Sequence, residues 1–133
     1  MLPFEFTIKG PPVSHQTKKR ARLQQWKSDV NQAATAAWGG SAPVGVDVSV
    51  TITYFYDGSA PDVDNIIKPI QDALIGVVFV DDDQVVDTKS RKRAITGSFR
   101  IRGVSAIVLA AFAVGDDFLH IKVDNAPDME ALD

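Results

Sequence analysis

The sequence predicts an α/β (α+β) fold, a single domain in which a mixed β-sheet packs against two helices. The chain has 133 residues, of which 45% are hydrophobic, and this length suits one domain with a substantial buried core. Over residues 1–114, strand-like and helix-like segments follow one another in the order β-α-β-α-β-β-β, which is typical of such a fold. We place the domain at residues 1–114 and expect residues 115–133 to form an acidic C-terminal segment, with one strand before a disordered end.

The first half of the chain contains two predicted strands and a long helix. Leu2–Lys9 alternates between apolar and polar side chains, as a half-buried strand does, and Gly10-Pro11-Pro12 ends it. Lys19–Trp38 has the apolar spacing of a helix and is followed by two glycines. Val46–Tyr56 is the strongest predicted strand because it is rich in β-branched and aromatic residues. The predicted buried stripe of the helix comprises Leu23, Trp26, Val30, Ala33, Ala34 and Ala37.

The second half contains one short predicted helix and four predicted strands. Asn65–Ile75 is expected to be a helix that ends at Gly76, and Pro69 is tolerated because it falls near the first turn. Apolar runs between turn residues indicate the strands. These strands are Val77–Val80, Gln84–Lys89, Arg100–Phe112 and Phe118–Val123.

The composition excludes several classes of protein. There is no cysteine, so neither disulfides nor thiolate metal ligands are available, and the two histidines, His15 and His120, do not favour a zinc centre. No apolar run reaches the roughly 18 residues of a membrane span, and the first residues do not resemble a signal peptide. We therefore expect a cytoplasmic protein without membrane contacts, in which any bound metal has oxygen ligands.

The charged residues are unevenly distributed, although the formal net charge is only −3. Six acidic residues and one lysine follow Gly115, whereas Lys9–Lys27 and Lys89–Arg102 contain basic residues and no acidic one. Charge alone leaves two interpretations open for these segments, a phosphate-binding surface and a merely solvated one. The candidates for phosphate contacts are Lys18, Lys19, Arg20, Arg22, Lys89, Arg91, Lys92 and Arg93.

Acidic residues gather in two nearby motifs, PDVDNIIK at residues 61–68 and VDDDQ at residues 80–84. An extended backbone would place the carboxylates of Asp62 and Asp64 on one side, and Lys68 would follow Asp64 at i+4 on the helix. The helix climbs about 16 Å at roughly 1.5 Å per residue. A returning strand descends about 13 Å at roughly 3.3 Å per residue. The spacing therefore predicts that Asp81–Asp83 lie beside Asp62 and Asp64.

Carboxylates that meet in this way repel one another unless a cation lies between them, by about 1 kcal/mol at roughly 4 Å in water. Oxygen ligands without thiolate or imidazole favour Mg²⁺ or Mn²⁺. Such a centre promotes attack on a phosphodiester, and Lys68 would help to hold the phosphate. An EF-hand is excluded because Ile66 and Ile67 occupy positions that need an oxygen ligand and a glycine. Spacing alone leaves open whether the acids form a metal centre or a solvated acidic turn.

Two strings, PDVDNIIKPIQDAL and FVDDDQVVD, resemble the RusA family of Holliday junction resolvases of bacteria, phages and prophages. The family pattern is D-x-D-N-x-x-K, a helix ending in D-A-L, then D-D-x-Q-V-x-D, and the resemblance implies a RusA-like fold. It also implies that Asp62, Asp64 and Asp82 are catalytic metal ligands. Lys68 resembles the essential lysine of the family, and Asp81 would assist in metal binding. Supporting roles are implied for Asn65, Asp72 and Gln84.

By this resemblance the chain is expected to be a metal-dependent, structure-selective endodeoxyribonuclease. It would resolve four-way (Holliday) DNA junctions by paired cleavage in recombination and repair. The family acts as a homodimer with Mg²⁺ or Mn²⁺, and the eight basic candidates would then hold the phosphates of the junction arms. Two features depart from the family: Ser59-Ala60 lacks a basic side chain often found there, and the acidic C-terminal segment is not part of the family core. The alternative is a DNA-binding or regulatory module with weak nuclease activity that uses this segment to bind a protein partner.

Overall fold

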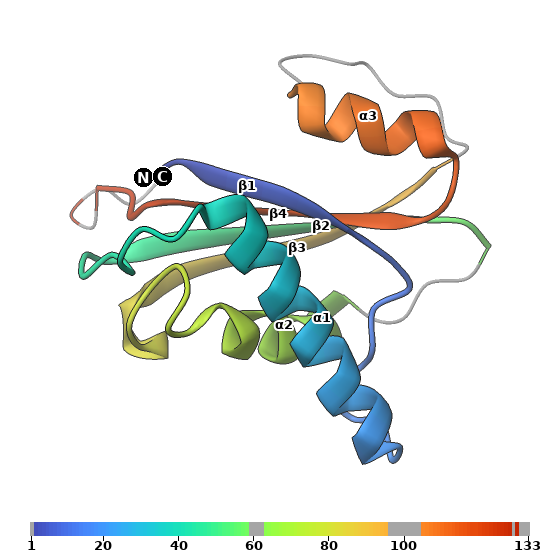
Figure 1. Ribbon diagram of the computed structural model, residues 1–133, viewed down its shortest axis with the longest axis horizontal. Helices are drawn as coiled ribbons and strands as arrows, with labels where there is room; N and C mark the ends of the chain where they lie inside the picture. Colours follow the sequence, from blue (N-terminus) through green and yellow to red (C-terminus); the bar gives the residue numbers. More distant parts are fainter. Residues whose placement is uncertain (1, 59–62, 96–104, 129, 131–133) are drawn as a thin grey trace.

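The fold is built on a four-stranded mixed sheet with helices on both faces. The computed structural model describes residues 2–58, 63–95, 105–128 and 130. Along the sheet the strands are ordered β1-β4-β2-β3. Helices α1 and α2 cover one face, and α3 lies on the other (Figure 1). The strands are β1 (Phe4–Lys9), β2 (Val48–Tyr56), β3 (Val85–Ala94) and β4 (Phe118–Asn125), and the helices are α1 (Arg20–Trp38), α2 (Ile67–Leu74) and α3 (Ala106–Val114).

Strand β4 occupies a central position in the sheet. It pairs antiparallel with β1 and with β2, so that Ile121 lies opposite both Phe6 and Ile52. β2 pairs in parallel with β3, which leaves β3 at one edge. Leu119 and Ile121 are fully buried. The strand predicted over Phe118–Val123 is confirmed, and the acidic C-terminal segment therefore contributes part of the sheet.

Helix α1 packs on the sheet through the face that its apolar spacing predicts. Its buried residues are Leu23, Trp26, Val30, Ala34 and Trp38. Trp38 contacts the ring of Phe4 on β1 edge-on, with ring centroids 5.0 Å apart. The helix ends where Gly39 takes a left-handed conformation, at φ 80°, which a glycine adopts without steric cost. The helix, its terminus and most of its buried stripe were predictable because one amphipathic period extends over the whole segment, but Ala37 is exposed and Trp38 is buried in its place.

The predicted strand Val77–Val80 is a turn instead. Gly76 has φ 82°, and the backbone N–H groups of Val77 and Val78 both donate to the carbonyl oxygen of Leu74. Phe79 forms only isolated bridges, to Val44 and to Ile75. Both Val78 and Phe79 are fully buried. The apolar run signals burial beneath the sheet, and an apolar run by itself does not distinguish a strand from a buried turn.

The predicted strand Arg100–Phe112 is also wrong within the described residues, where Ala106–Val114 forms α3; residues 96–104 lie outside them. Ser105 begins the helix by accepting a hydrogen bond from Val108 N at 3.4 Å, and Gly115 ends it at φ 86°. Uniformly apolar residues carry no periodicity, so the cap residues decide the conformation. The fold class is confirmed, with three α-helices instead of the two predicted. Among the described residues, no helix is both long and apolar enough to cross a membrane.

For the other strands and helices, the predicted limits differ from the observed limits by a few residues. The predicted helix Asn65–Ile75 begins as the 3₁₀-helix η1 (Val63–Ile66) and continues as α2, whose third residue is Pro69. The strand predicted from Gln84 is confirmed as β3, but it extends to Ala94. A second 3₁₀-helix, η2 (Asp82–Gln84), precedes it.

We predict that Leu119→Ala lowers the free energy of unfolding by about 2–5 kcal/mol, because it leaves a cavity in the central strand. Val46→Ala, at a side chain that is 53% exposed, should change it by less than about 0.5 kcal/mol. Urea denaturation followed by circular dichroism measures both. A loss for Leu119→Ala as small as that of the control would show that β4 adds little to the stability of the sheet.

Candidate functional site

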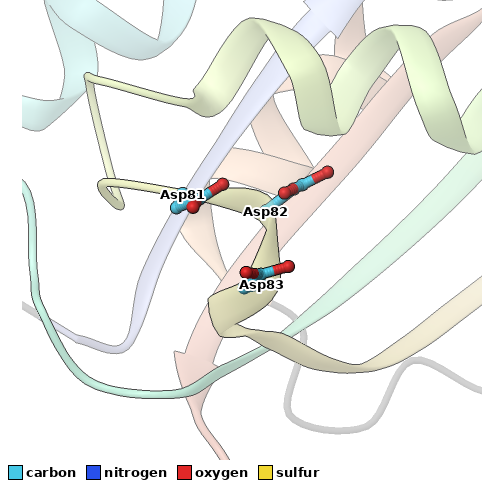
Figure 2. A group of neighbouring side chains, drawn as sticks. All are labelled: Asp81, Asp82 and Asp83. Carbon is cyan, nitrogen blue, oxygen red and sulfur yellow. The ribbon is translucent and has the colours of Figure 1, made fainter.

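Three consecutive aspartates form the most concentrated group of possible metal ligands within the described ranges. Asp81, Asp82 and Asp83 are exposed, and one carboxylate oxygen from each lies within 4.8 Å of those of the others. Asp81 precedes η2 and the other two begin it. Figure 2 shows the three side chains on one turn, directed to the same side of it. The turn therefore offers hard oxygen ligands from three residues to one point in space.

The side-chain amide of Gln84 holds this turn to the rest of the protein. Its Oε1 accepts hydrogen bonds from the backbone N–H groups of Val80, at 2.8 Å, and Asp81, at 2.9 Å. Its Nε2 donates to the carbonyl oxygens of Val44, at 2.9 Å, and Val46, at 2.7 Å. The Asp81 side chain in turn accepts from the backbone N–H of Gln84, which completes a capping box. All four hydrogen-bonding positions of the amide are thus used.

The carboxylates of the turn lie close enough together to raise the pKa of Asp82. Hydrogen bonding with Asp81 raises the pKa of Asp82, and the charges of Asp81 and Asp83 raise it further. Lys68 acts in the opposite direction. A divalent cation would relieve this repulsion, and carboxylate oxygens without thiolate or imidazole are the donors that Mg²⁺ and Mn²⁺ prefer. The residues present therefore fit such an ion.

Lys68 on α2 lies beside the acidic turn and is held by a neighbouring acid. Its Nζ donates to Asp72 Oδ1 at 2.7 Å, and Asp72 Oδ2 lies 3.7 Å from Nζ of Lys27 on α1. The hydrogen bond to Asp72 and the charge of Asp72 raise the pKa of Lys68, and the charge of Asp82 also raises it. Lys68 is thus a firmly protonated cation within the electrostatic reach of the aspartates. Asp72 thus bridges two lysines, one on α1 and one on α2.

Asp64 and Asn65 lie in η1, which two hydrogen bonds connect to neighbouring elements. Ser90 Oγ on β3 donates to the carbonyl oxygen of Val63 at 2.7 Å. The backbone N–H of His15 donates to the carbonyl oxygen of Asn65, also at 2.7 Å. Asp64 is exposed on a 3₁₀ turn instead of on the extended segment that we expected. Its carboxylate is not among the three that cluster within 4.8 Å, and Asp62 lies outside the described residues.

The first basic group, Lys18, Lys19, Arg20 and Arg22, surrounds the start of α1. No acidic residue is present in the first turn of this helix, and no side chain caps it. Cations at a helix N-terminus oppose the helix dipole, so helix stability does not account for them. An open groove of about 520 Å³ lies beside them, lined among others by Gln16, Lys19 and Arg22. The hydrogen bond from His15 to Asn65 places this basic segment next to η1.

The second basic group is divided between the two faces of β3. Ser90 and therefore Lys92 point to the face that carries α2 and η1, since alternate residues of a strand share a face. Lys89, Arg91 and Arg93 occupy the opposite face, where Arg91 Nε donates to Thr53 Oγ1 at 2.8 Å. Only Lys92 of this group therefore shares a face with α2 and η1. A basic edge strand also resists pairing with other chains, which is the structural alternative to DNA binding.

Lys27, the second partner of Asp72, was absent from the predicted set. The spacing placed Asp83 with Asp81 and Asp82, but Asp83 was not assigned as a metal ligand, and its carboxylate completes the acidic group. Lys27 carries no local signal, since it reaches Asp72 only through the packing of α1 against α2.

Two comparisons with known proteins bear on this site. A family model described as endodeoxyribonuclease RusA matches residues 7–102. The match covers η1, Lys68, the acidic turn and both basic groups, whereas α3 and β4 follow it. No curated protein matched the chain in the second comparison.

We predict that Gln84→Ala lowers the free energy of unfolding by about 1–3 kcal/mol, because four backbone groups lose their partner. It should also weaken Mg²⁺ binding by roughly tenfold or more, since the turn is no longer held in one geometry. Gln25→Ala is the matched control, because the amide of Gln25 bonds only Asp29 on the exposed side of α1. Urea denaturation and titration calorimetry provide the two readouts. Equal effects of the two substitutions would show that water replaces the Gln84 amide without loss.

Proposed function

Because the chain belongs to the RusA family of endodeoxyribonucleases, which resolve Holliday junctions, we propose that it cuts four-way DNA junctions by divalent-cation-dependent hydrolysis of paired phosphodiesters. The products would serve DNA recombination and repair in the cytoplasm. The observation that carries this proposal is the acidic turn with the protonated Lys68 beside it. Carboxylates and an ammonium group at one point are the parts that phosphoryl transfer requires.

The acidic residues are proposed to hold Mg²⁺ or Mn²⁺. Asp81 and Asp82 would be ligands together with Asp83, and Asp62 and Asp64 would contribute from the preceding motif. A divalent cation bound there supplies Lewis acidity and lowers the pKa of water near the scissile phosphate. Gln84 and Asn65 would keep the two acidic segments in position.

Lys68 is proposed to contact a non-bridging oxygen of the scissile phosphate. Its hydrogen bond to Asp72 and the long-range attraction of Asp82 keep it protonated, so its charge is available when negative charge develops on the phosphate. Asp72 acts as a positioning residue, because its second oxygen is directed to Lys27. Replacing Asp72 would therefore affect cleavage through Lys68.

The basic groups are proposed to bind the sugar-phosphate backbone of the arms. His15 hydrogen-bonds Asn65 of η1, and Ser90 and therefore Lys92 face η1, which supports assigning the arm nearest the proposed cleavage site to five residues: Lys18, Lys19, Arg20, Arg22 and Lys92. Lys89, Arg91 and Arg93 would contact an arm that passes around the edge strand. Such contacts supply affinity without sequence selectivity. Two opposed cuts in one junction also require two sites, and we therefore propose a homodimer.

We predict that Asp64→Asn reduces Mg²⁺-dependent cleavage of a labelled four-way junction by more than about a hundredfold. Junction binding should persist, because the substitution removes no cation. Asp29→Asn, at an exposed acid of α1, should cut at the wild-type rate. Symmetric nicks in junctions, absent from linear duplex, would be measured by denaturing gel electrophoresis with Mg²⁺ or Mn²⁺. Tight junction binding without cleavage by the wild-type protein would instead favour a DNA-binding or regulatory module.

We predict that Arg22→Gln weakens junction binding several-fold and reduces the slope of log affinity against log salt by about 1, as the loss of one phosphate contact requires. Stability should stay unchanged or rise slightly, since a cation is removed from the positive end of α1. Lys9→Gln is the control, because that exposed lysine pairs with Asp116 away from the first basic group. Fluorescence anisotropy at several salt concentrations measures the slope. Identical slopes for Arg22→Gln and the wild type would remove Arg22 from the DNA interface.

A further inference from the structure

The connection between β1 and α1, residues 10–19, leads into the first basic group (Figure 1). Among the described residues, two backbone hydrogen bonds join this connection to elements other than α1. His15 N–H donates to the carbonyl oxygen of Asn65 at 2.7 Å, and Gly10 N–H donates to that of Asp117 at 3.1 Å. Each of these two attachments therefore helps to fix the path of the connection.

A side-chain hydrogen bond from the middle of the sheet reinforces the second attachment. Tyr54 Oη on β2 donates to Asp117 Oδ2 at 2.7 Å, and Asp117 immediately precedes β4. The side chain of Tyr54 is fully buried. Burial raises the pKa of Tyr54, and the hydrogen bond to Asp117 raises it further, so the phenol stays a proton donor throughout the neutral range. A hydrogen bond to a carboxylate is also stronger than one between two neutral groups.

Gly10 lies directly against this pair of side chains. A Cβ atom at Gly10 would lie 3.1 Å from Asp117 Oδ2 and 3.3 Å from Tyr54 Cε1. Both distances are shorter than an ordinary van der Waals contact, so a larger residue would displace the carboxylate or the ring. The need for glycine here is close approach of the backbone. Gly10, Tyr54 and Asp117 therefore form one unit, the Tyr54 anchor, which joins the end of β1 to β2 and to the start of β4.

We propose that the Tyr54 anchor positions the first basic group for contact with the DNA backbone, and that Tyr54 and Asp117 are positioning residues of the nuclease. This inference rests on the proposed function, which assigns the basic group to DNA. Asp117 follows residues 7–102, which the family model matches, and belongs to the acidic C-terminal segment. An acidic residue of this segment would thus support DNA binding without contacting DNA.

The basic group needs such support because its own charges oppose its arrangement. Its four cations lie close together in sequence, and like charges repel one another. They also lie at the positive end of the α1 dipole, and no acidic residue is present in the first turn of the helix to offset them. Without an attachment at Gly10, the connection would be held through its backbone by the single hydrogen bond from His15 to Asn65. The anchor therefore limits how far the cations can move apart.

The alternative is that the anchor only adds stability to the sheet, and matched variants distinguish the two roles. Asp116→Ala removes the same charge as Asp117→Ala, but Asp116 pairs with the exposed Lys9 at 3.8 Å. Gly45→Ala is the control for Gly10→Ala, since a Cβ atom at Gly45 meets nothing within 4 Å. Asp117→Asn retains an oxygen that accepts from Tyr54, so it should behave as the wild type does.

Hydrogen exchange without DNA or metal tests the anchor itself. Asp117→Ala and Gly10→Ala should each accelerate exchange of the His15 amide by more than about tenfold relative to the Ile121 amide in the central strand. Asp117→Asn and the two controls should leave this ratio unchanged. Thermal unfolding verifies that the variants are folded. Equal acceleration at both amides would indicate a general loss of stability and would overturn the inference, as would unchanged exchange at His15.

Junction binding separates this inference from the proposed nuclease activity. In the non-cutting Asp64→Asn background, Asp117→Ala should weaken junction affinity at least about fivefold and lower the slope of log affinity against log salt by more than about 1, because several phosphate contacts are lost together. In the active protein KM should rise, with kcat changed by less than about twofold. Asp117→Asn should restore affinity, slope and KM.

The two proposals can fail separately. A wild-type protein that neither binds nor cuts junctions would refute the proposed function and the DNA role of the anchor, and the His15 amide would still show whether the anchor holds the connection. A wild-type protein that cuts junctions, combined with unchanged affinity and salt dependence in Asp117→Ala, would retain the nuclease and overturn the inference alone.

Discussion

The side-chain amide of Gln84 is the interaction on which the site depends. Three aspartates repel one another on an exposed turn, and an isolated turn would relax by moving them apart. Gln84 prevents this. Its side-chain oxygen accepts hydrogen bonds from the backbone N–H groups of Val80 and Asp81, and its side-chain nitrogen donates to the carbonyl oxygens of Val44 and Val46. The geometry of the acids is thus maintained by neutral hydrogen bonds to the main chain. The repulsion between the carboxylates therefore persists, and a bound cation would relieve it.

The sheet divides the molecule into two working surfaces. On one face, α2 brings Lys68 within the electrostatic reach of Asp82, and the basic start of α1 adjoins η1 through the hydrogen bond from His15 to Asn65. On the other face, Phe112 of α3 packs against Phe55 and Phe118, and Arg91 of β3 donates to Thr53.

Prediction succeeded where a local pattern carries the information. The helix over Lys19–Trp38 and the strand over Val46–Tyr56 have strong periodicity or strong β-propensity, and both are present with small shifts at their starts. It failed for Val77–Val80 and for the segment ending at Phe112, which are apolar runs without a period. Such runs indicate burial or an apolar environment. Gly76 turns the first of these segments, and Ser105 and Gly115 cap the second as a helix. The grouping of Asp81 and Asp82 with Lys68 was predicted from a returning strand over Val77–Val80, and the grouping is present although this segment is a turn.

The chemistry of the protein can be read from its residue types and short spacings: carboxylates without thiolates, a lysine four residues after Asp64, and basic segments free of acids. These follow from residue types and short spacings, which survive any folding of the chain. Packing of distant segments is needed to learn that Gln84 reaches Val44 and Val46, that Lys27 shares Asp72 with Lys68, and that β4 lies in the middle of the sheet. It also decided that Lys92 and Arg91 face opposite ways relative to α2. Each of these depends on contacts between residues far apart in sequence, and such contacts leave no local periodicity for a sequence to display.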